Sequence, residues 1–206
     1  GLTEDEIKSM ADINQMLWSQ LKVEMSSWLT NKGGRYCICD TQMVEAIKRC
    51  FAQGDMCIDE CRHKIITSLL DNKDILSHQL TFADYSYRMK QFCYHDSYRY
   101  KVEITYQSYK MQERNFLRKW ICDVELFEIL YRTNCSLLEE CWKALMSDEP
   151  SFMPDVYAEL DFGQVDSFLI PVIANDMATF LSRSFHLTKV ANAVSEKCME
   201  GAAIPP

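Results

Sequence analysis

The stretch from Ser97 to Arg132, SYRYKVEITYQSYKMQERNFLRKWICDVELFEILYR, decides the fold class of this chain. In its second half, apolar residues recur three or four positions apart, which places them on one face of a helix. They are Phe116, Leu117, Trp120, Ile121, Val124, Phe127 and Leu130. Because no glycine or proline interrupts the stretch, it predicts mostly one long helix over 97–132.

The start of the same stretch leaves a second structure open. Apolar and polar residues alternate there, which is the period of a strand. The alternating apolar positions are Tyr98, Tyr100, Val102, Ile104 and Tyr106. A short strand at this point is therefore the alternative to a continuous helix.

The residues before this stretch also predict helices. Thr3 and Glu6 have the spacing of a capping box, and apolar residues continue at helical spacing from Ile7 to Trp28. The pair Gly33-Gly34 is interpreted as the end of this first helix, because glycine adopts the left-handed conformation easily. Further helices are predicted from about 40 to 53, from 56 to 71 and from 81 to 94.

After the central stretch, Ser136 and Glu139 predict a second capping box. The first proline of the chain is Pro150, and together with Pro154 it predicts a loop over 148–154. A helical segment from Asp166, kinked or started at Pro171, and a last helix over 187–199 are expected beyond it. The fold class is thus predicted to be all-α, an irregular bundle of six to eight helices in a single domain, 1–206, with a subregion boundary near 148–154.

Ten cysteines are a high number for 206 residues and predict up to five disulfides that staple the bundle in an oxidising compartment. Cys37 and Cys39 lie too close in the sequence for an easy mutual bond, so each is expected to pair elsewhere. Asn134-Cys135-Ser136 is an acceptor triplet for glycosylation at Asn134. The candidate disulfide cysteines are Cys37, Cys39, Cys50, Cys57, Cys61, Cys93, Cys122, Cys135, Cys141 and Cys198.

A zinc site is the alternative interpretation of some of these cysteines. Cys57, Cys61 and His63 could ligate zinc together with Cys37 and Cys39. The usual Cys-x-x-Cys knuckle is absent, however, so disulfides or buried thiols are favoured and no metal is predicted.

The sequence contains no motif that names a reaction. It has no glycine-rich phosphate loop, nucleophile elbow, His-Glu-x-x-His pair or EF-hand loop. Its four histidines stand in no local catalytic signature. We therefore predict that the protein is not an enzyme and that it has neither catalytic residues nor a cofactor.

Charge and tyrosine are distributed unevenly along the chain. Residues 86–119 hold eight Lys/Arg against three Asp/Glu, whereas residues 123–166 hold two against eleven. Seven of the ten tyrosines lie between Tyr85 and Tyr109. Tyrosine and arginine are enriched where proteins bind one another, so the region around Tyr98 to Arg118 is the predicted contact surface, although burial in the core is the competing explanation. The candidate partner-binding residues are Arg99, Tyr100, Tyr106, Tyr109, Arg114 and Arg118.

Together these features favour a non-enzymatic extracellular interaction module, either a secreted protein or part of a receptor or surface-protein ectodomain, that binds another protein. The alternative is a secreted helical carrier of a small apolar ligand, which the eleven methionines suggest. An intracellular, reduced or zinc-binding helical protein is the third hypothesis. The net charge of −8 argues against nucleic acid as a partner. The longest apolar run, 168–174, is too short to span a bilayer, and a start at Gly1 suggests a mature or trimmed chain.

Overall fold

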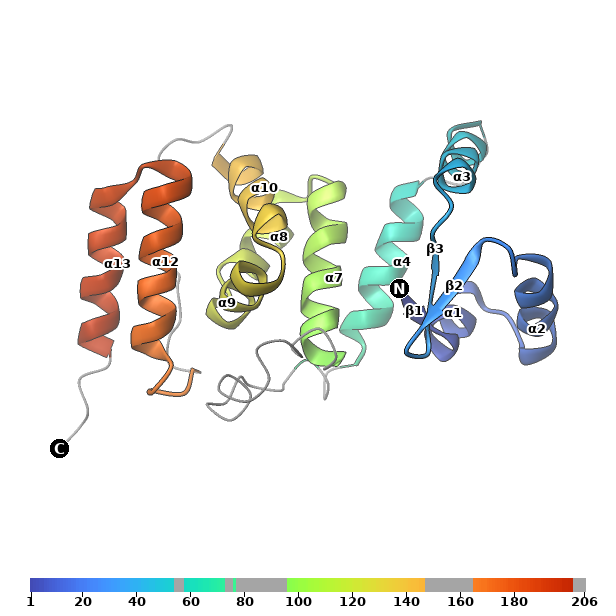
Figure 1. Ribbon diagram of the computed structural model, residues 1–206, viewed down its shortest axis with the longest axis horizontal. Helices are drawn as coiled ribbons and strands as arrows, with labels where there is room; N and C mark the ends of the chain where they lie inside the picture. The colour runs from blue at the N-terminus through green and yellow to red at the C-terminus, as the bar shows by residue number, and fades with distance from the viewer. Residues whose placement is uncertain (54–57, 73–75, 77–95, 147–164, 202–206) are drawn as a thin grey trace. The chain divides into compact units, whose positions relative to one another are not determined.

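The structure is a computed structural model that describes residues 1–53, 58–72, 76, 96–146 and 165–201 (Figure 1). Clustering of the backbone divides the chain into two compact units, Gly1–Asp71 and Asn72–Pro206. The predicted helix over 81–94 and the predicted boundary over 148–154 lie outside the described residues, and the prediction of a single domain stays a prediction.

The first unit contains helices and a small sheet, so the prediction of an all-α fold is wrong for this part. Its helices are α1 (Glu4–Ala11), α2 (Gln15–Glu24), α3 (Thr41–Gln53) and α4 (Ile58–Leu70). Its strands are β1 (Leu2–Thr3), β2 (Leu29–Lys32) and β3 (Arg35–Ile38). The strands are antiparallel and follow the order β1-β3-β2 (Figure 1).

Gly33 and Gly34 form the turn of the β2–β3 hairpin and do not end a helix. Lys32 pairs with Arg35, so the two glycines are the whole loop, with φ angles of 62° and 81°. A two-residue hairpin loop with both φ angles positive is the type that matches the twist of the strands, and glycine adopts it without strain. Each of the two strands has only four residues and its burial does not alternate, so the sequence carries no strand period at this place.

The predicted first helix is two helices. The capping box at Thr3 and Glu6 is present, since the Thr3 hydroxyl accepts from the Glu6 N–H and the Glu6 carboxylate accepts from the Thr3 N–H. However, α1 ends at Asp12, which adopts a left-handed φ of 52°. Asn14 then caps α2 by accepting a hydrogen bond from the Leu17 N–H.

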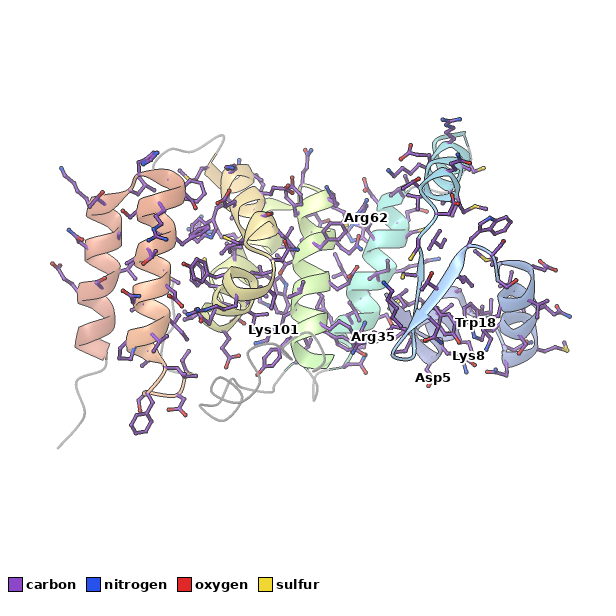
Figure 2. The ribbon with its side chains drawn as sticks, viewed as in Figure 1. Asp5, Lys8, Trp18, Arg35, Arg62 and Lys101 are labelled. Carbon is purple, nitrogen blue, oxygen red and sulfur yellow. The ribbon has the colours of Figure 1, made fainter. Side chains whose placement is uncertain are left out.

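Few apolar side chains are buried in the first unit. Among its described residues they are Trp18 of α2 and Ile66 and Leu69 of α4. The Trp18 ring meets the Tyr36 ring edge-on at 5.2 Å between centroids, which joins α2 to β3 (Figure 2). The Lys22 ammonium lies 5.7 Å from the Trp18 ring centroid and also forms an ion pair with Glu4.

The second unit is helical throughout its described residues. Its helices are α7 (Asp96–Lys110), α8 (Arg114–Ile121), α9 (Val124–Thr133), α10 (Cys135–Met146), α12 (Ile170–Phe185) and α13 (Thr188–Gly201). With the first unit this makes ten helices in the described ranges, more than the six to eight predicted. None of these described helices has the length and apolar character needed to cross a membrane.

The predicted long helix over 97–132 is in fact three helices, α7, α8 and α9. The strand alternative is also wrong, since Tyr98 to Tyr106 lie within α7. The chain turns at Gln112, whose φ is 56°, and again at Asp123, which caps α9 by accepting from the Leu126 N–H. Neither turn contains glycine or proline, which is why the sequence pattern did not show them.

The core of the second unit lies where α9 packs against α7, α8, α10 and α12. The Phe127 ring of α9 meets the Phe180 ring of α12 at 5.6 Å between centroids. Every residue from Val124 to Leu130 is buried, so α9 is surrounded by the other helices. The last two helices, α12 and α13, form a hairpin of neighbouring helices (Figure 1), and Pro171 stands in the first turn of α12, as predicted for a helix start.

The prediction of a disulfide-stapled bundle is not supported. No disulfide joins the cysteines whose side chains the structure describes, which are Cys37, Cys39, Cys50, Cys61, Cys122, Cys135 and Cys141. Cys57, Cys93 and the side chain of Cys198 lie outside the described set. Cys141 is fully buried on α10 and fills space in the core as a small apolar side chain.

Candidate functional site

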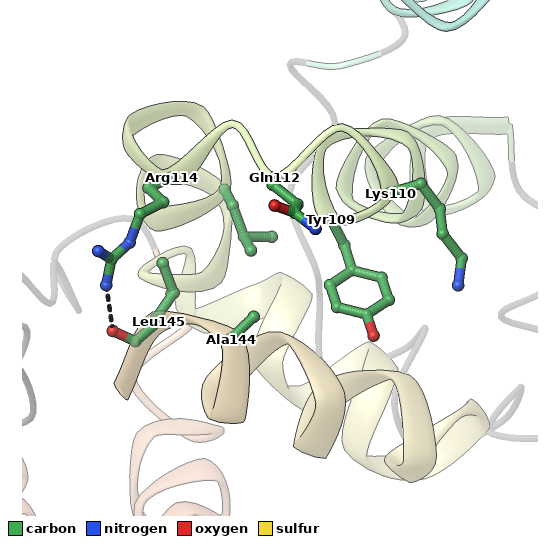
Figure 3. A pocket seen from close by; sticks show the side chains of 7 residues that line it. Tyr109, Lys110, Gln112, Arg114, Ala144 and Leu145 are labelled. Carbon is green, nitrogen blue, oxygen red and sulfur yellow. Dashed lines mark hydrogen bonds between the residues drawn. The ribbon is translucent and has the colours of Figure 1, made fainter. Parts of the chain in front are cut away.

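A shallow groove in the second unit lies between the end of α7, the start of α8 and the end of α10. We call it the α7–α10 groove (Figure 3). Its volume is about 530 Å³. It is lined by Tyr109, Lys110, Gln112, Arg114, Leu117, Ala144 and Leu145.

The turn between α7 and α8 shapes one wall of the groove. The Glu113 N–H donates to the Ser108 carbonyl at 3.2 Å, and the Gln112 N–H donates to the Tyr109 carbonyl at 3.1 Å. With Gln112 in the left-handed conformation, this is the Schellman pattern that ends many helices. The pattern reverses the chain and sets Arg114 at the first position of α8, beside the groove.

Arg114 connects this wall to the opposite one. Its Nη2 donates a hydrogen bond of 2.8 Å to the Leu145 carbonyl, in the last turn of α10 (Figure 3). Carbonyl groups in a last turn lack partners within their helix and carry partial negative charge, so a guanidinium there is favourable. Arg114 therefore holds α8 against α10 and gives the groove a defined width.

Tyrosine and lysine form the outer edge of the groove. The Tyr109 side chain extends toward α10 (Figure 3), where burial and then the nearby Glu140 carboxylate raise the pKa of its hydroxyl. The Lys110 ammonium lies 4.9 Å from the Tyr109 ring centroid and 5.5 Å from that of Tyr106. Tyr106 is 39% exposed, so a cation and an aromatic ring face the solvent side by side.

The groups that line the groove are mostly polar or charged. Lys110, Arg114, Gln112 and Tyr109 provide an ammonium, a guanidinium, an amide and a phenol beside the apolar Leu117 and Leu145. Among these described lining residues, no nucleophile lies beside a base. The nearby Cys141 thiol stays protonated, because burial, reinforced by Glu140, raises its pKa to about 12. In the described residues of either unit, no three His, Cys, Asp or Glu side chains converge on a point where a metal could bind.

The six residues predicted to bind a partner do not form one surface. Tyr109 and Arg114 line the α7–α10 groove, and Tyr106 lies beside it. Tyr100 is only 5% exposed and belongs to the core. Arg99 has its guanidinium 4.6 Å from the Tyr100 ring centroid, and Arg118, half-buried on α8, lies one turn after Arg114.

Arg99 lines a second, smaller hollow between α7 and α9, of about 250 Å³. Asn134, the predicted glycosylation site, lies on the same hollow and is exposed. Its side-chain oxygen accepts a 3.2 Å hydrogen bond from the Leu137 N–H, so Asn134 caps α10. The cap predicted at Ser136 is thus displaced by two residues.

Sequence reasoning missed Lys110, Gln112, Leu117, Ala144 and Leu145. Lys110 could have been predicted from the sequence, because it follows Tyr109 within the basic, tyrosine-rich segment. The α10 residues had none, since Leu145 is 31 positions from Arg114 and only packing brings them together.

Comparisons with protein-family models, with curated proteins and with solved structures found no match to this chain.

Proposed function

We propose that the chain is a non-enzymatic interaction module and that the α7–α10 groove binds a segment of another protein. The observation that carries the proposal is the edge of this groove, where the Lys110 ammonium lies against two tyrosine rings above an apolar floor. Binding surfaces commonly combine aromatic rings with polar groups, because a rigid aromatic ring provides a large contact area and loses little conformational entropy on contact.

The chemistry of this edge favours a partner segment with an acidic side chain next to an apolar one. An acidic group would meet the exposed Lys110, while an apolar side chain would pack against the exposed part of the Tyr106 ring, since Leu117 and Leu145 are themselves nearly buried. Arg114 is already engaged with the Leu145 carbonyl, so its part is to hold the groove open. The mixed lining suits a peptide better than the wholly apolar ligand of the carrier hypothesis.

The extracellular location is proposed along with this function, on the number of cysteines and the Asn134 triplet. The intact mass before and after reduction tests it. Bridges or an attached glycan on protein from its natural source support secretion, whereas ten thiols would favour the intracellular hypothesis.

The groove is tested by selecting displayed random dodecamer peptides against the whole chain. We expect enriched peptides to be acidic with at least one large apolar residue. In fluorescence polarisation, Lys110→Glu should weaken a synthetic enriched peptide about tenfold, as expected for a central contact of about 1.4 kcal/mol. Tyr106→Ala should weaken it less, because only part of its ring faces the solvent.

The matched control is Lys48→Glu, which makes the same charge change at an exposed lysine of α3 in the first unit. It should leave peptide affinity unchanged. Tyr100 is left intact in these variants, because truncating a buried ring would disturb the core. Peptides that bind Lys110→Glu as tightly as the original chain would overturn the groove assignment, and uptake of an apolar dye that the peptides displace would favour a carrier.

A further inference from the structure

A second site lies in the first unit, at the end of β3. The Cys37 and Cys39 sulfurs are 3.5 Å apart. Cys37 lies on β3 and Cys39 is the first residue after it, so the two thiols meet where the strand ends. The structure joins neither thiol to another described cysteine, so the predicted pairing of each with a distant partner is not supported.

The backbone permits a bond between them, with some strain. At about 3.3–3.4 Å rise per residue, two strand positions lie about 6.6–6.8 Å apart. Disulfides accept Cα separations up to about 6.8 Å, so this pair is at the upper limit. Cys39 follows Ile38, the last residue of β3. Among the described backbone hydrogen bonds, one connects Cys39 to the hairpin: its N–H donates to the Trp28 carbonyl at 3.3 Å.

The two thiols are not equivalent. Cys39 is exposed, and hydrogen bonding to Thr30 and then to Cys37 lowers the pKa of its thiol. Cys37 is half-buried in the sheet opposite Thr30, and its thiol has a raised pKa because of its hydrogen bond to Cys39 and its burial. An exposed thiol with the lower pKa is the one that attacks, and its neighbour is placed to complete the exchange.

We infer that Cys37 and Cys39 form a reversible thiol–disulfide exchange site that reacts with small disulfides such as oxidised glutathione. The Cys39 thiolate attacks one sulfur of the small disulfide, and the first small thiol leaves. The Cys37 thiolate then attacks the Cys39 sulfur, and the second small thiol leaves. Two protein thiols are oxidised to one disulfide, while one small disulfide is reduced to two thiols.

The strain predicts that this disulfide is easily reduced again. Strained or exposed disulfides have more oxidising potentials than structural ones. A disulfide would shorten the distance between the α-carbons of Cys37 and Cys39. This would move the Cys39 N–H away from the Trp28 carbonyl, so oxidation should weaken that hydrogen bond at the end of the hairpin. The site is independent of the groove in the second unit.

The whole chain can test this without substitution, because trypsin releases residues 36–48, which contain Cys37 and Cys39 and no other cysteine. The reduced protein is equilibrated with mixtures of oxidised and reduced glutathione, quenched with acid, alkylated and digested. We expect the folded chain to need a ratio of oxidised to reduced glutathione about tenfold higher than the guanidinium-unfolded chain does, because the folded hairpin strains the 37–39 disulfide and makes it easier to reduce. Equal ratios for the folded and unfolded chain would overturn the inference.

Single substitutions separate the two roles. In Cys37→Ser, a glutathione adduct should accumulate on Cys39, because the second step is blocked. In Cys39→Ser, the adduct on Cys37 should form several-fold more slowly. Cys50→Ser, which removes an exposed cysteine of α3, should leave oxidation of the 37–39 peptide unchanged. Equal adduct rates in the first two variants would contradict the assigned roles.

Discussion

At the scale of single residues, the second unit depends on buried ion pairs. Lys101 of α7 is buried, and its ammonium lies 2.9 Å from a Glu125 oxygen and 3.3 Å from an Asp123 oxygen. Arg132, which is exposed, connects the buried Glu128 of α9 with Asp176 of α12. Removing one member of a buried ion pair lowers the free energy of unfolding by more than the intact pair adds to it. The reason is that the other charge remains in a poorly solvated site.

We predict that Lys101→Met lowers the free energy of unfolding by about 3–5 kcal/mol, the usual cost of breaking a buried pair from one side. Urea unfolding of the whole chain measures it. Adding Glu125→Leu to Lys101→Met should restore part of the loss, since the buried carboxylate is then gone. Lys119→Met removes an exposed lysine of α8 and should change stability by less than about 0.5 kcal/mol. A Lys101→Met cost as small as this control would contradict the prediction.

The same pair predicts a pH dependence. Burial lowers the pKa of Lys101, but Asp123 and Glu125 more than offset this, so its folded pKa lies above 10.5. The stabilisation is therefore complete below pH 10.5 and is lost as the pH rises through the folded pKa. Lys101→Met should accordingly flatten the alkaline limb of the stability profile.

At the scale of elements, three of the described helices end where a non-glycine residue adopts the left-handed conformation. Asp12, Gln112 and His186 have φ angles of 52°, 56° and 56° at the ends of α1, α7 and α12. The left-handed conformation raises the free energy of a non-glycine residue by about 1–2 kcal/mol relative to the right-handed conformation. The chain breaks its helices at Asp12 and Gln112 without a glycine or proline. The helices predicted from the sequence therefore run through both positions.

We predict that Gln112→Gly raises the free energy of unfolding by about 0.5–1 kcal/mol, because glycine adopts a positive φ without strain, although it also loosens the unfolded chain. Thermal or urea unfolding measures this. Gln112→Ala is the control, since alanine keeps the β-carbon that causes the strain. If alanine and glycine give equal stability, Gln112 is not a strained cap.

At the scale of the whole molecule, the two units differ in how much apolar surface they bury. Trp18, Ile66 and Leu69 are the buried apolar residues described in the first unit, whereas α9 alone is buried over seven consecutive residues in the second. Burial of apolar area is the main source of stability, at about 25 cal/mol per Å². The first unit should therefore be the less stable of the two.

This difference can be measured by hydrogen exchange with mass spectrometry at increasing urea concentrations. Peptides from α1 to α4 should reach full exchange at lower urea than peptides from α9 and α12, because local stability follows the burial around each amide. Trp18→Ala should lower the midpoint of the first unit and leave that of α9 unchanged. A single shared midpoint for all peptides would show that the chain unfolds as one cooperative body.

The sequence by itself determined that most of the chain is helical, and it located the Thr3 capping box, the start of α12 near Pro171 and several helix ranges. These depend on neighbours three or four residues apart, so a local pattern suffices. It also indicated Tyr106, Tyr109 and Arg114, because tyrosine and basic residues cluster in one segment.

Only the tertiary structure decided which of these side chains face the solvent. Tyr100 and Tyr106 stand six positions apart on α7, yet one is buried and the other exposed, because α7 packs against other helices on most of its sides. The groove needs Arg114 to meet Leu145, and the hairpin needs Gly33-Gly34 to join two strands. Contacts between distant residues depend on the whole packing arrangement, which no local pattern in the chain records.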